Sequence, residues 1–554
     1  MVQWSFVACA IGALIAIFGA ILGFGVFPVL VGKKVEESLI IVEGTDQYER
    51  FITVPQPLLF KVYIFNITNP EEVQEGALPI VKEVGPYIYK QYRKKKIKDF
   101  SRDKTTVTFT QQQTYEFDYM ASAPLTHSDK VVTLNMHMNA FLQVFEQEIK
   151  DILRNFVNRF NKTLDRTPVV RILKRILERI RGKRKSILQA IENDPGLSLL
   201  MTHINANLNG VFNNPTSMFM STTVREYLFE GIRFCVKPTG LARAICKQIR
   251  EKGSKTIRTM DDGSLAFSFF NHKNRTNDGV FEVHTGLGNS QKLLEIEKWE
   301  DSETIQIWLN STDGETSVCN LINGTDAASF PPFRKRGDSM YIFSSDICRS
   351  VQLFYEHDIK YKGIPGFRYT TGDNFLNSIG PEYSNGCFCV DRLVNVIKKK
   401  NGCLLSGAMD LTPCIDAPVI LTLPHMLGAA KEYTRLVRGQ TPNQQKHQTY
   451  VDVQHITGTP LQGGKRVQFN MFLKHINKIT LTENLTTSLV PAIWVEEGIA
   501  LNQEMVNLIK GQLIDTLKIL DIVFWTLIVV GLLIMVMSFL WYFLTVKDPV
   551  VPIK

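Results

Sequence analysis

The 554-residue sequence lacks the short motifs that are typical of enzymes and nucleotide-binding proteins. It contains no G-x-S-x-G nucleophile elbow, no H-E-x-x-H zinc helix and no P-loop, and GLGNSQ at residues 286–291 departs from the dinucleotide-binding fingerprint at its last glycine. The 10 histidines are scattered, and the stretch CFC does not have the C-x-x-C spacing of a zinc site. These absences predict a protein without covalent chemistry, without a metal ion and without a cofactor.

A strong charge of either sign is also missing. The chain has 63 basic and 54 acidic residues, and a net charge of +9 is mild for this length, so it does not indicate a nucleic-acid-binding protein. With 44% hydrophobic residues the chain can form a large packed core and is not a disordered protein. No internal repeat or low-complexity linker divides it, which favours one large domain.

Long apolar runs are confined to the two ends of the sequence. Residues 6–31 and 522–546 carry no charged side chain, and each run exceeds the ~20 residues that cross a bilayer as a helix. The first run is too long for the apolar part of a signal peptide and lacks a basic segment before it, so we expect a retained signal anchor. The sequence predicts two membrane-spanning helices, short cytoplasmic tails at 1–5 and 547–554, and a loop over residues 32–521.

The side of the membrane on which this loop lies is indicated by its N-x-T sequons, since the charges that flank the two runs are uninformative. All six sequons lie in the loop, at Asn66, Asn161, Asn274, Asn310, Asn323 and Asn484. Together with the cysteines, they favour an extracellular loop, with both termini in the cytoplasm and the two helices in the plasma membrane.

Of the nine cysteines, Cys9 lies in the first apolar run and eight lie in the loop. An even number is typical of disulfide pairing in an oxidising compartment. Six cysteines are clustered at Cys319, Cys348, Cys387, Cys389, Cys403 and Cys414, and the spacing alone leaves about 15 connectivities open among them.

The sequence of the loop predicts mainly β-strands with a helical insertion. Stretches such as FKVYIFNIT (60–68), ETIQIWL (303–309) and KRVQFNMFL (465–473) show the alternation or the β-branched and aromatic enrichment of strands. Residues from about 136 to 229 show a period of 3.6 instead, which predicts a group of helices.

Within that insertion, residues 167–185 form a basic amphipathic pattern. Apolar side chains recur on one face, and Arg171, Lys174, Arg175 and Arg179 occupy the other. An extracellular helix is not expected to bind nucleic acid, and the anionic lipid that attracts basic helices is found mainly in the cytoplasmic leaflet. Two interpretations remain: a docking surface for an acidic partner, or the solvated face of a helix that packs on the insertion.

Phrases along almost the whole chain resemble the class B scavenger receptor family. They include CNLINGTDAASFPPF (319–333), YIFSSDICRS (341–350), NRTNDGVFEVHTG (274–286) and PAIWVEEG (491–498). Within this family, the phrase FCVKPTGLARAICKQI (234–249) is most similar to the insect sensory neuron membrane proteins.

The resemblance implies an α+β fold: a large antiparallel β-rich ectodomain, a helical apex bundle at about 136–229 and an internal hydrophobic tunnel, anchored by two transmembrane helices. It also implies three disulfides, Cys319–Cys387, Cys348–Cys414 and Cys389–Cys403, which leaves Cys235 and Cys246 as an expected fourth pair.

The function implied by the resemblance is that of a receptor or co-receptor for long-chain, lipid-derived odorants such as pheromones. It would receive them from an odorant-binding protein and pass them through the tunnel to the membrane or to an odorant receptor. Some fatty-acid-binding relatives place a lysine just before the SMF motif, whereas Asn213 and Asn214 stand there in this chain, which favours an uncharged head group. The alternatives are a scavenger or lipid-uptake receptor in non-neuronal cells, and a two-span channel, whose spans would need a polar stripe that residues 522–546 do not show.

Overall fold

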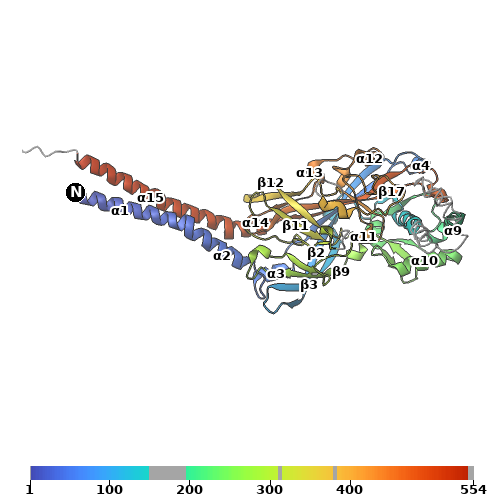
Figure 1. Cartoon of the computed structure of the whole chain (residues 1–554), viewed down its shortest axis with the longest axis horizontal. Coiled ribbons are helices and arrows are strands. Elements are labelled where there is room, and N and C mark those ends of the chain that lie inside the picture. Colours follow the sequence, from blue (N-terminus) through green and yellow to red (C-terminus); the bar gives the residue numbers. More distant parts are fainter. Residues whose placement is uncertain (1, 149–194, 310–314, 378–382, 547–554) are drawn as a thin grey trace, which may run out of the picture.

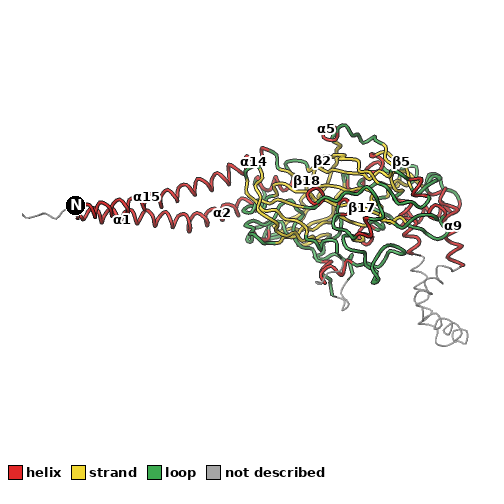
Figure 2. The backbone as a smooth tube through the Cα atoms, turned by 90° about the horizontal axis from the view of Figure 1, so that it is seen from above, coloured by secondary structure: helices red, strands yellow, loops and turns green. Residues whose placement is uncertain are grey.

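A pair of long helices projects from one end of an elongated body (Figures 1 and 2). The computed structural model describes residues 2–148, 195–309, 315–377 and 383–546. Helix α1 (Val2–Ile21), the π-helical turn η1 (Leu22–Val26) and α2 (Phe27–Leu39) form one arm, and α14 (Gln503–Ile509), η9 (Lys510–Ile514) and α15 (Asp515–Val546) form the other. Both arms are long and apolar enough to cross a membrane, at Gln3–Leu39 and Gln503–Leu544. Both therefore continue as helix beyond the predicted spans 6–31 and 522–546, toward the body.

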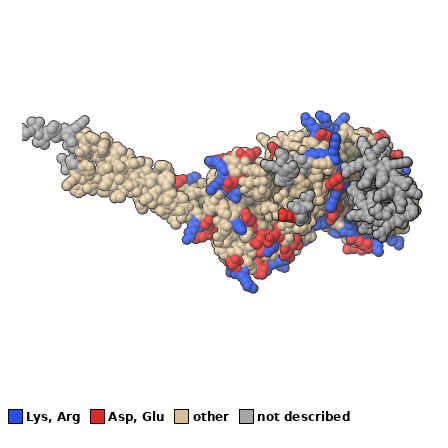
Figure 3. Space-filling model, viewed as in Figure 1, with Lys and Arg blue, Asp and Glu red and all other residues tan. Residues whose placement is uncertain are grey.

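The two arms pack closely because small residues lie where they touch. A Cβ atom added to Gly531 would lie 2.6 Å from both the Gly12 carbonyl oxygen and the Ala16 nitrogen. On the face shown in Figure 3, the outer part of the helix pair carries no Lys, Arg, Asp or Glu, and charged side chains begin where it meets the body. This distribution is the one expected of helices in a lipid bilayer.

The body is built on a single 13-stranded sheet in which every pair is antiparallel. Its main path runs β10-β9-β3-β2-β1-β18-β17-β16-β13-β12-β11, and β15 pairs with β17 and with β14. The strands are β1 (Leu58–Ile67), β2 (Val81–Phe100), β3 (Thr106–Phe117), β9 (Thr276–His284), β10 (Ile296–Trp299), β11 (Ser339–Ser344), β12 (Arg349–Tyr361), β13 (Ile364–Thr371), β14 (Met409–Asp410), β15 (Ile420–Thr422), β16 (Tyr450–Val453), β17 (Pro460–Leu473) and β18 (Ser488–Ala500).

The strands nearest the two arms are neighbours in the sheet. β1, which follows the first arm, pairs with β18, which precedes the second, and Val62 faces Val495 across them. Phe60, Val62 and Ile64 of β1 are buried at alternate positions, as a strand with an apolar inner face requires. The predicted antiparallel β-rich body is confirmed.

Helices gather at the end of the body opposite the two arms, which we call the apex (Figure 1). It contains the helix of residues 136–148, α9 (Pro195–Val211) and α10 (Gly240–Lys252), and α9 packs against α10. Two small antiparallel sheets accompany the helices: β4 (Lys130–Leu134) with β5 (Phe219–Thr223), and β6 (Ile232–Phe234), β8 (Leu265–Phe267) and β7 (Ile257–Thr259). The predicted helical stretch 136–229 therefore includes the strand β5, and α10 lies beyond it.

Short helical segments connect the strands. The α-helical ones are α3 (Asp46–Ile52), α4 (Pro70–Gln74), α5 (Tyr119–Ser122), α11 (Thr412–Ile415), α12 (Lys431–Thr434) and α13 (Gln444–His447). The 3-10 and π turns are η2 (Glu226–Glu230), η3 (Asn271–Lys273), η4 (Ser290–Lys292), η5 (Val318–Asn320), η6 (Tyr383–Phe388), η7 (Pro424–Met426) and η8 (Thr480–Thr482).

One predicted strand is wrong. Residues 303–309 form no strand, although Ile305 and Trp308 are buried. The buried Asn320 side chain replaces a strand partner: its Oδ1 accepts from the Trp308 nitrogen at 2.9 Å and its Nδ2 donates to the Trp308 carbonyl oxygen at 3.1 Å. Side-chain hydrogen bonds of this kind satisfy an extended backbone without a neighbouring strand.

Candidate functional site: an apolar cavity with a charged floor

A cavity of about 770 Å³ lies between the apex helices and one face of the large sheet. Its upper walls are mainly aromatic and come from the helix of residues 136–148, from the end of α9 and from the small apex sheet: Phe141, Phe145, Phe212, Phe234 and Phe267. Stacked rings such as Phe141 with Phe145 and Phe212 with Phe234 form continuous apolar surface. This volume is in the usual range for a small-molecule site.

The strand period decides which sheet residues reach the cavity. On β17 the lining residues are Lys465, Val467, Phe469 and Met471, at alternate positions. Residues at alternate positions of a strand lie on one face of the sheet, so the intervening side chains point to the opposite face. On β18, Val495 faces Val467 and Glu497 faces Lys465 across the ladder. The wall formed by these two strands is therefore apolar near the apex and charged farther away from it.

The charged end of this wall lies toward the membrane arms. Asn139 of the apex helix donates to the Phe472 carbonyl oxygen at 2.9 Å, next to Met471, whereas Gln462 of β17 pairs with Ala500, just before α14. Going from Met471 to Lys465 therefore leads from the apex toward the membrane. We call the charged end the ionic floor. It consists of the lining residues Lys273, Asp346, Lys465 and Glu497, together with Arg93 and Asp278, which interact with them without lining the cavity.

Direct ion pairs hold the ionic floor together. The Lys465 ammonium donates to Asp346 Oδ2 at 2.7 Å and to Ser344 Oγ at 2.8 Å, and Lys273 pairs with the other Asp346 oxygen. Arg93 of β2 pairs with Glu497. Asp278 accepts from Gln113 and from Ser345, both at 3.2 Å.

The side chains of Lys273, Lys465 and Asp346 remain 21%, 31% and 31% exposed. Because all three line the cavity, we attribute this exposure to the cavity space rather than to the outer surface.

Burial and charge shift the titration of these groups in opposite directions. Burial lowers the pKa of Lys273, which is partly offset by the carboxylates of Asp278 and Glu497. Burial alone would raise the pKa of Glu497, but Arg93, Lys465 and Lys273 hold it well below its ordinary value. Glu497 is therefore an anion at neutral pH, and its neighbours supply the positive charge that a buried carboxylate requires.

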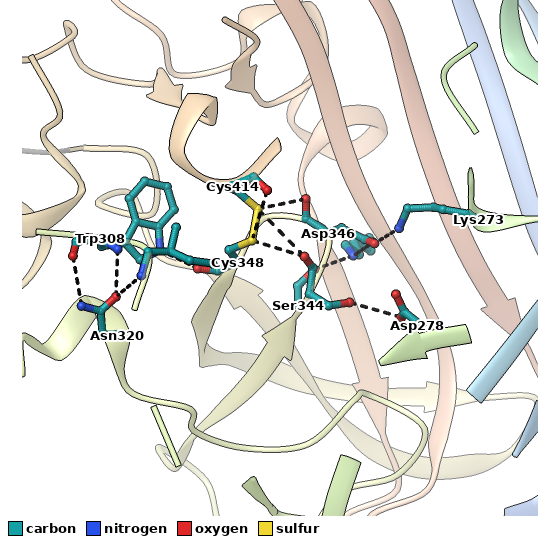
Figure 4. Close-up of a disulfide and its surroundings, with 11 residues drawn as sticks. Lys273, Asp278, Trp308, Asn320, Ser344, Asp346, Cys348 and Cys414 are labelled. Carbon is teal, nitrogen blue, oxygen red and sulfur yellow. Dashed lines mark hydrogen bonds and ion pairs between the residues drawn. A yellow bond between two sulfur atoms is a disulfide. The ribbon is translucent and has the colours of Figure 1, made fainter. Parts of the chain in front are cut away.

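A disulfide fixes the segment that carries Asp346 (Figure 4). Cys348 is bonded to Cys414, and the Sγ atoms of these residues lie 3.5 Å from the Ser345 carbonyl oxygen and 3.8 Å from the Asp346 carbonyl oxygen respectively. Lys273 points toward Asp346 in the same view. The disulfide thus positions one wall of the ionic floor.

The cavity reaches the outer surface near the apex. Glu148, Glu251, Lys252 and Lys255 are both exposed and part of its lining. Glu148 at the end of the apex helix pairs with Lys252 at the end of α10. We call these four residues the rim.

One polar side chain interrupts the aromatic upper walls. His137 lies 4.9 Å from the Phe234 ring and 5.5 Å from the Phe267 ring, measured between centroids. Burial lowers its pKa to about 3, so the imidazole is neutral at physiological pH.

The structure contains the three disulfides that the family resemblance implied, Cys319–Cys387, Cys348–Cys414 and Cys389–Cys403, and also the pair that was left over, Cys235–Cys246. The last pair links the segment after β6 to α10. Cys9, in α1, is a free thiol.

Of the predicted docking residues, Asn213 and Asn214 do not line the described cavity. Asn213 and Asn214 are exposed at the end of α9, with φ angles of 57° and 58°, and Asn213 Nδ2 donates to the Arg233 carbonyl oxygen at 2.8 Å. Asparagine is well suited to such left-handed positions after a helix. The residues Arg171, Lys174, Arg175 and Arg179 lie outside the described part of the chain.

The predicted glycosylation sites differ in their surroundings. Asn484 is exposed, whereas Asn66, Asn274 and Asn323 are half-buried. Asn66 Oδ1 accepts from the Val132 nitrogen at 2.7 Å, and Asn274 Oδ1 accepts from the Tyr115 nitrogen at 3.1 Å. Asn161 and Asn310 lie outside the described residues.

The ionic floor was not predicted from the sequence. The sequence feature that could have revealed it is the alternation K-x-V-x-F-x-M in β17, which places a lysine on the same face of the strand as three apolar cavity residues. Among the described residues, no group of three or more His, Cys, Asp and Glu side chains is placed to hold a metal ion.

Comparison with known proteins decides the family. The CD36 family profile matches residues 10–542. The chain belongs to the CD36 family. The resemblance to class B scavenger receptors is thus confirmed. Sensory neuron membrane protein 2 of Drosophila melanogaster is 62% identical over 98% of this chain and 98% of its own length.

More distant relatives cover nearly the same length. Sensory neuron membrane protein 2 of Anopheles gambiae is 51% identical over 98% of this chain and 94% of its own. Sensory neuron membrane protein 1 of Manduca sexta is 29% identical over 98% of this chain and 91% of its own. Membership of the CD36 family and the two apolar arms fit a two-span plasma-membrane protein, and they point to a receptor rather than an enzyme.

Proposed function

We propose that this protein is a cell-surface receptor or co-receptor that captures long-chain, lipid-derived odorants in the apex cavity and passes them toward the membrane or an odorant receptor. The observation that carries the proposal is the aromatic cavity of about 770 Å³, which opens at the rim and leads toward the membrane arms. The sensory role is supported by the names of the relatives, which are sensory neuron membrane proteins in Drosophila melanogaster and Anopheles gambiae.

Apolar walls suit such ligands energetically. Each CH₂ group that moves from water into an apolar environment gains about 0.8 kcal/mol, so a long alkyl chain obtains most of its affinity without a specific polar contact. Hydrophobic binding is also non-directional, which allows a chain to slide along the walls. Both properties suit a protein that takes up a ligand at one end and releases it at the other.

The proposed orientation places the body outside the cell and both termini in the cytoplasm. Four disulfides in the described residues support an oxidising compartment for the body. The exposed sequon at Asn484 supports the same side of the membrane.

An acidic carrier, such as an odorant-binding protein, would deliver the ligand to the apex. This part of the proposal is carried by the basic residues Arg171, Lys174, Arg175 and Arg179 together with Asn213 and Asn214 at the end of α9. Charge complementarity between two proteins raises association rates in a salt-dependent manner. Reversal of charge at Arg171, Lys174 and Arg175 is expected to slow carrier association and to reduce its salt dependence; unchanged association would remove the docking role.

The role of the cavity as the ligand site is tested by filling it with a larger side chain. The full-length chain, in lipid nanodiscs, is irradiated with a long-chain alkyl probe that carries a diazirine, and labelled peptides are identified by mass spectrometry. Ala140 lines the cavity, so Ala140→Trp is expected to reduce labelling of cavity peptides at least about tenfold. The matched control is Ala121→Trp, at an exposed position of α5.

Equal labelling of both variants, or labelling of surface peptides alone, would show that the cavity is not the ligand site.

A scavenger or lipid-uptake receptor shares the same cavity and family, and the site of expression separates it from a sensory role. Antibody labelling of sensory dendrites would support the sensory proposal, and labelling restricted to non-neuronal cells would support uptake.

A further inference from the structure

The lysines of the ionic floor line the cavity and keep hydrogen-bond donors beyond those used in their contacts with Asp346 and Ser344. An ammonium group has three N–H donors, and the contacts of Lys465 with described residues use two of them, on Asp346 and Ser344. Lys273 contacts Asp346 through the same carboxylate. The remaining donors adjoin a space lined mainly by apolar side chains, where a hydrogen bond to a ligand would not compete with bulk water.

The charges of the ionic floor already balance one another. Arg93, Lys273 and Lys465 supply the positive charges, and Asp278, Asp346 and Glu497 supply the negative ones. The next charged pair on β2, Lys95 with Asp326, is also balanced. A ligand carboxylate would add a negative charge without a partner, and a buried, unpaired charge is costly.

We propose that the ionic floor is a head-group site for long-chain ligands with an uncharged carbonyl or hydroxyl head, and that it disfavours long-chain carboxylates. The oxygen of an aldehyde, an ester or an alcohol accepts a hydrogen bond from Lys465 or Lys273, and the alkyl chain extends along Val467, Phe469 and Met471 toward the apex. This inference rests on the proposed function, because it requires that the cavity binds long-chain ligands.

Two other places for a head group are less suitable. The rim is exposed, so water hydrates a head group there whatever its charge, and no discrimination follows. His137 has no described partner for its Nδ1 atom, but aromatic rings surround it and it offers a single neutral group. The ionic floor is the place where donors are both numerous and shielded from the outer solvent.

The test compares head groups on one chain length. The full-length chain in nanodiscs is labelled with the diazirine alkyl probe, and hexadecanal, hexadecyl acetate, hexadecanol, hexadecanoate and hexadecane are added as competitors. We expect the three uncharged oxygen heads to displace the probe at concentrations about tenfold lower than hexadecanoate. A second probe, with its diazirine beside an aldehyde mimic, is expected to label peptides that contain Lys273, Asp346 or Lys465.

Two substitutions separate the role of the floor from that of the apolar walls. Lys465→Met removes the donor and is expected to weaken competition by hexadecanal about tenfold relative to hexadecane. Asp346→Asn leaves the floor with an excess positive charge and is expected to reverse the order, so that hexadecanoate competes best. The matched control is Lys360→Met, at an exposed position of β12 away from the cavity. Each variant is compared only if its melting temperature is within a few degrees of that of the native protein. If Lys465→Met does not fold, the result for Asp346→Asn provides the test.

The outcomes distinguish the two proposals. If no probe labels cavity peptides in the native protein, the proposed function fails, and the head-group inference fails with it. If the probes label the cavity but hexadecanoate competes as well as hexadecanal, the cavity binds lipids and the inference alone is wrong. The same conclusion follows if Lys465→Met behaves like Lys360→Met, or if the head-group probe labels the rim or the His137 peptide instead.

Discussion

Lys465 of β17 and Glu497 of β18 face each other directly across an antiparallel ladder, and both line the cavity. Neither has the other as its closest ionic partner: Lys465 binds Asp346 at 2.7 Å, and Glu497 pairs with Arg93 of β2. The two central strands therefore form ion pairs with neighbouring elements on both sides. These ion pairs connect Asp346, which follows β11, and Arg93 of β2 to the two central strands that lie between them.

Arg93→Met is expected to destabilise the protein markedly. It leaves the buried Glu497 carboxylate without its direct partner, a change that typically costs about 3–5 kcal/mol. The measurement is the thermal unfolding temperature of the full-length chain in detergent. The control Arg336→Met removes an exposed ion pair with Asp358, whose partners are 71% and 47% exposed, and should change the unfolding temperature little. Equal shifts for the two variants would contradict a structural role for the Arg93 pair.

The Cys348–Cys414 disulfide is expected to contribute more stability than Cys235–Cys246. The sequence separations are 66 and 11 residues, and restriction of the unfolded chain grows with the size of the closed loop. Replacing both cysteines by serine should cost about 4 kcal/mol for the first pair and about 3 kcal/mol for the second. Unfolding temperatures of the two double variants provide the comparison, and a larger loss for the shorter loop would show that native contacts outweigh loop size.

Stability is expected to fall as the pH rises through the titration of Asp410. Burial raises the pKa of this carboxyl to about 6 from 3.8, although hydrogen bonds from Thr412 lower it in part. Between these values the folded state holds a proton that the unfolded state has lost, so the free energy of unfolding decreases with increasing pH and the full penalty is present above about pH 6.

Asp410→Asn should therefore raise the unfolding temperature at neutral pH and leave it nearly unchanged at about pH 4. The penalty that it removes is about 3 kcal/mol, from about 1.4 kcal/mol per unit of pKa shift. Unfolding temperatures of the native chain and the variant are measured over this range. Parallel pH profiles would show that Asp410 is not the titrating group.

The packing of the two arms is expected to depend on Gly531. A side chain there would meet the Gly12 carbonyl and the Ala16 backbone, so Gly531→Leu should separate α1 from α15. The measurement is the rate of disulfide cross-linking between cysteines placed on the two arms of the full-length chain. Gly25→Leu is the control, because no atom lies within 4 Å of its added Cβ. Equal rates for both variants would show that the small residues are not needed for the contact.

Glycosylation is expected at Asn484 if the body is extracellular. Its side chain is exposed, whereas Asn66 is half-buried and its amide oxygen accepts from the Val132 nitrogen at 2.7 Å. Asn484→Gln should increase the gel mobility of the protein expressed in insect cells, and peptide-N-glycosidase should abolish the difference. No difference before treatment would leave Asn484 unmodified and would weaken the proposed orientation.

Those parts of the fold that depend on local pattern were predictable from the sequence. The apolar runs at 6–31 and 522–546 identified the two arms, and alternation in 60–68 and 465–473 identified β1 and β17. The predicted strand at 303–309 failed because Thr304 forms only an isolated bridge with Leu321 and the Trp308 backbone is bonded by the side chain of Asn320, which no periodicity reveals.

The ionic floor could not be predicted because its members are far apart in the sequence. Lys273 is the last residue of η3, Asp346 follows β11, and Lys465 lies in a strand where lysine usually points to solvent. The alternation of β17 places that lysine on the same face as Val467, Phe469 and Met471, and the fold turns this face toward the cavity. The cavity itself was implied by the family resemblance, whereas the charge balance at its floor follows from the three-dimensional arrangement alone.

The adjacency of β1 and β18 has a mechanical consequence. Both strands are connected to the membrane arms at the same end of the body, and they are hydrogen-bonded from Leu59–Gly498 to Ile64–Ile493. A load applied at the apex by a bound partner is therefore shared by two bonded strands that are both anchored at the membrane end. Such a load runs along both strands together, instead of peeling one from the other one hydrogen bond at a time.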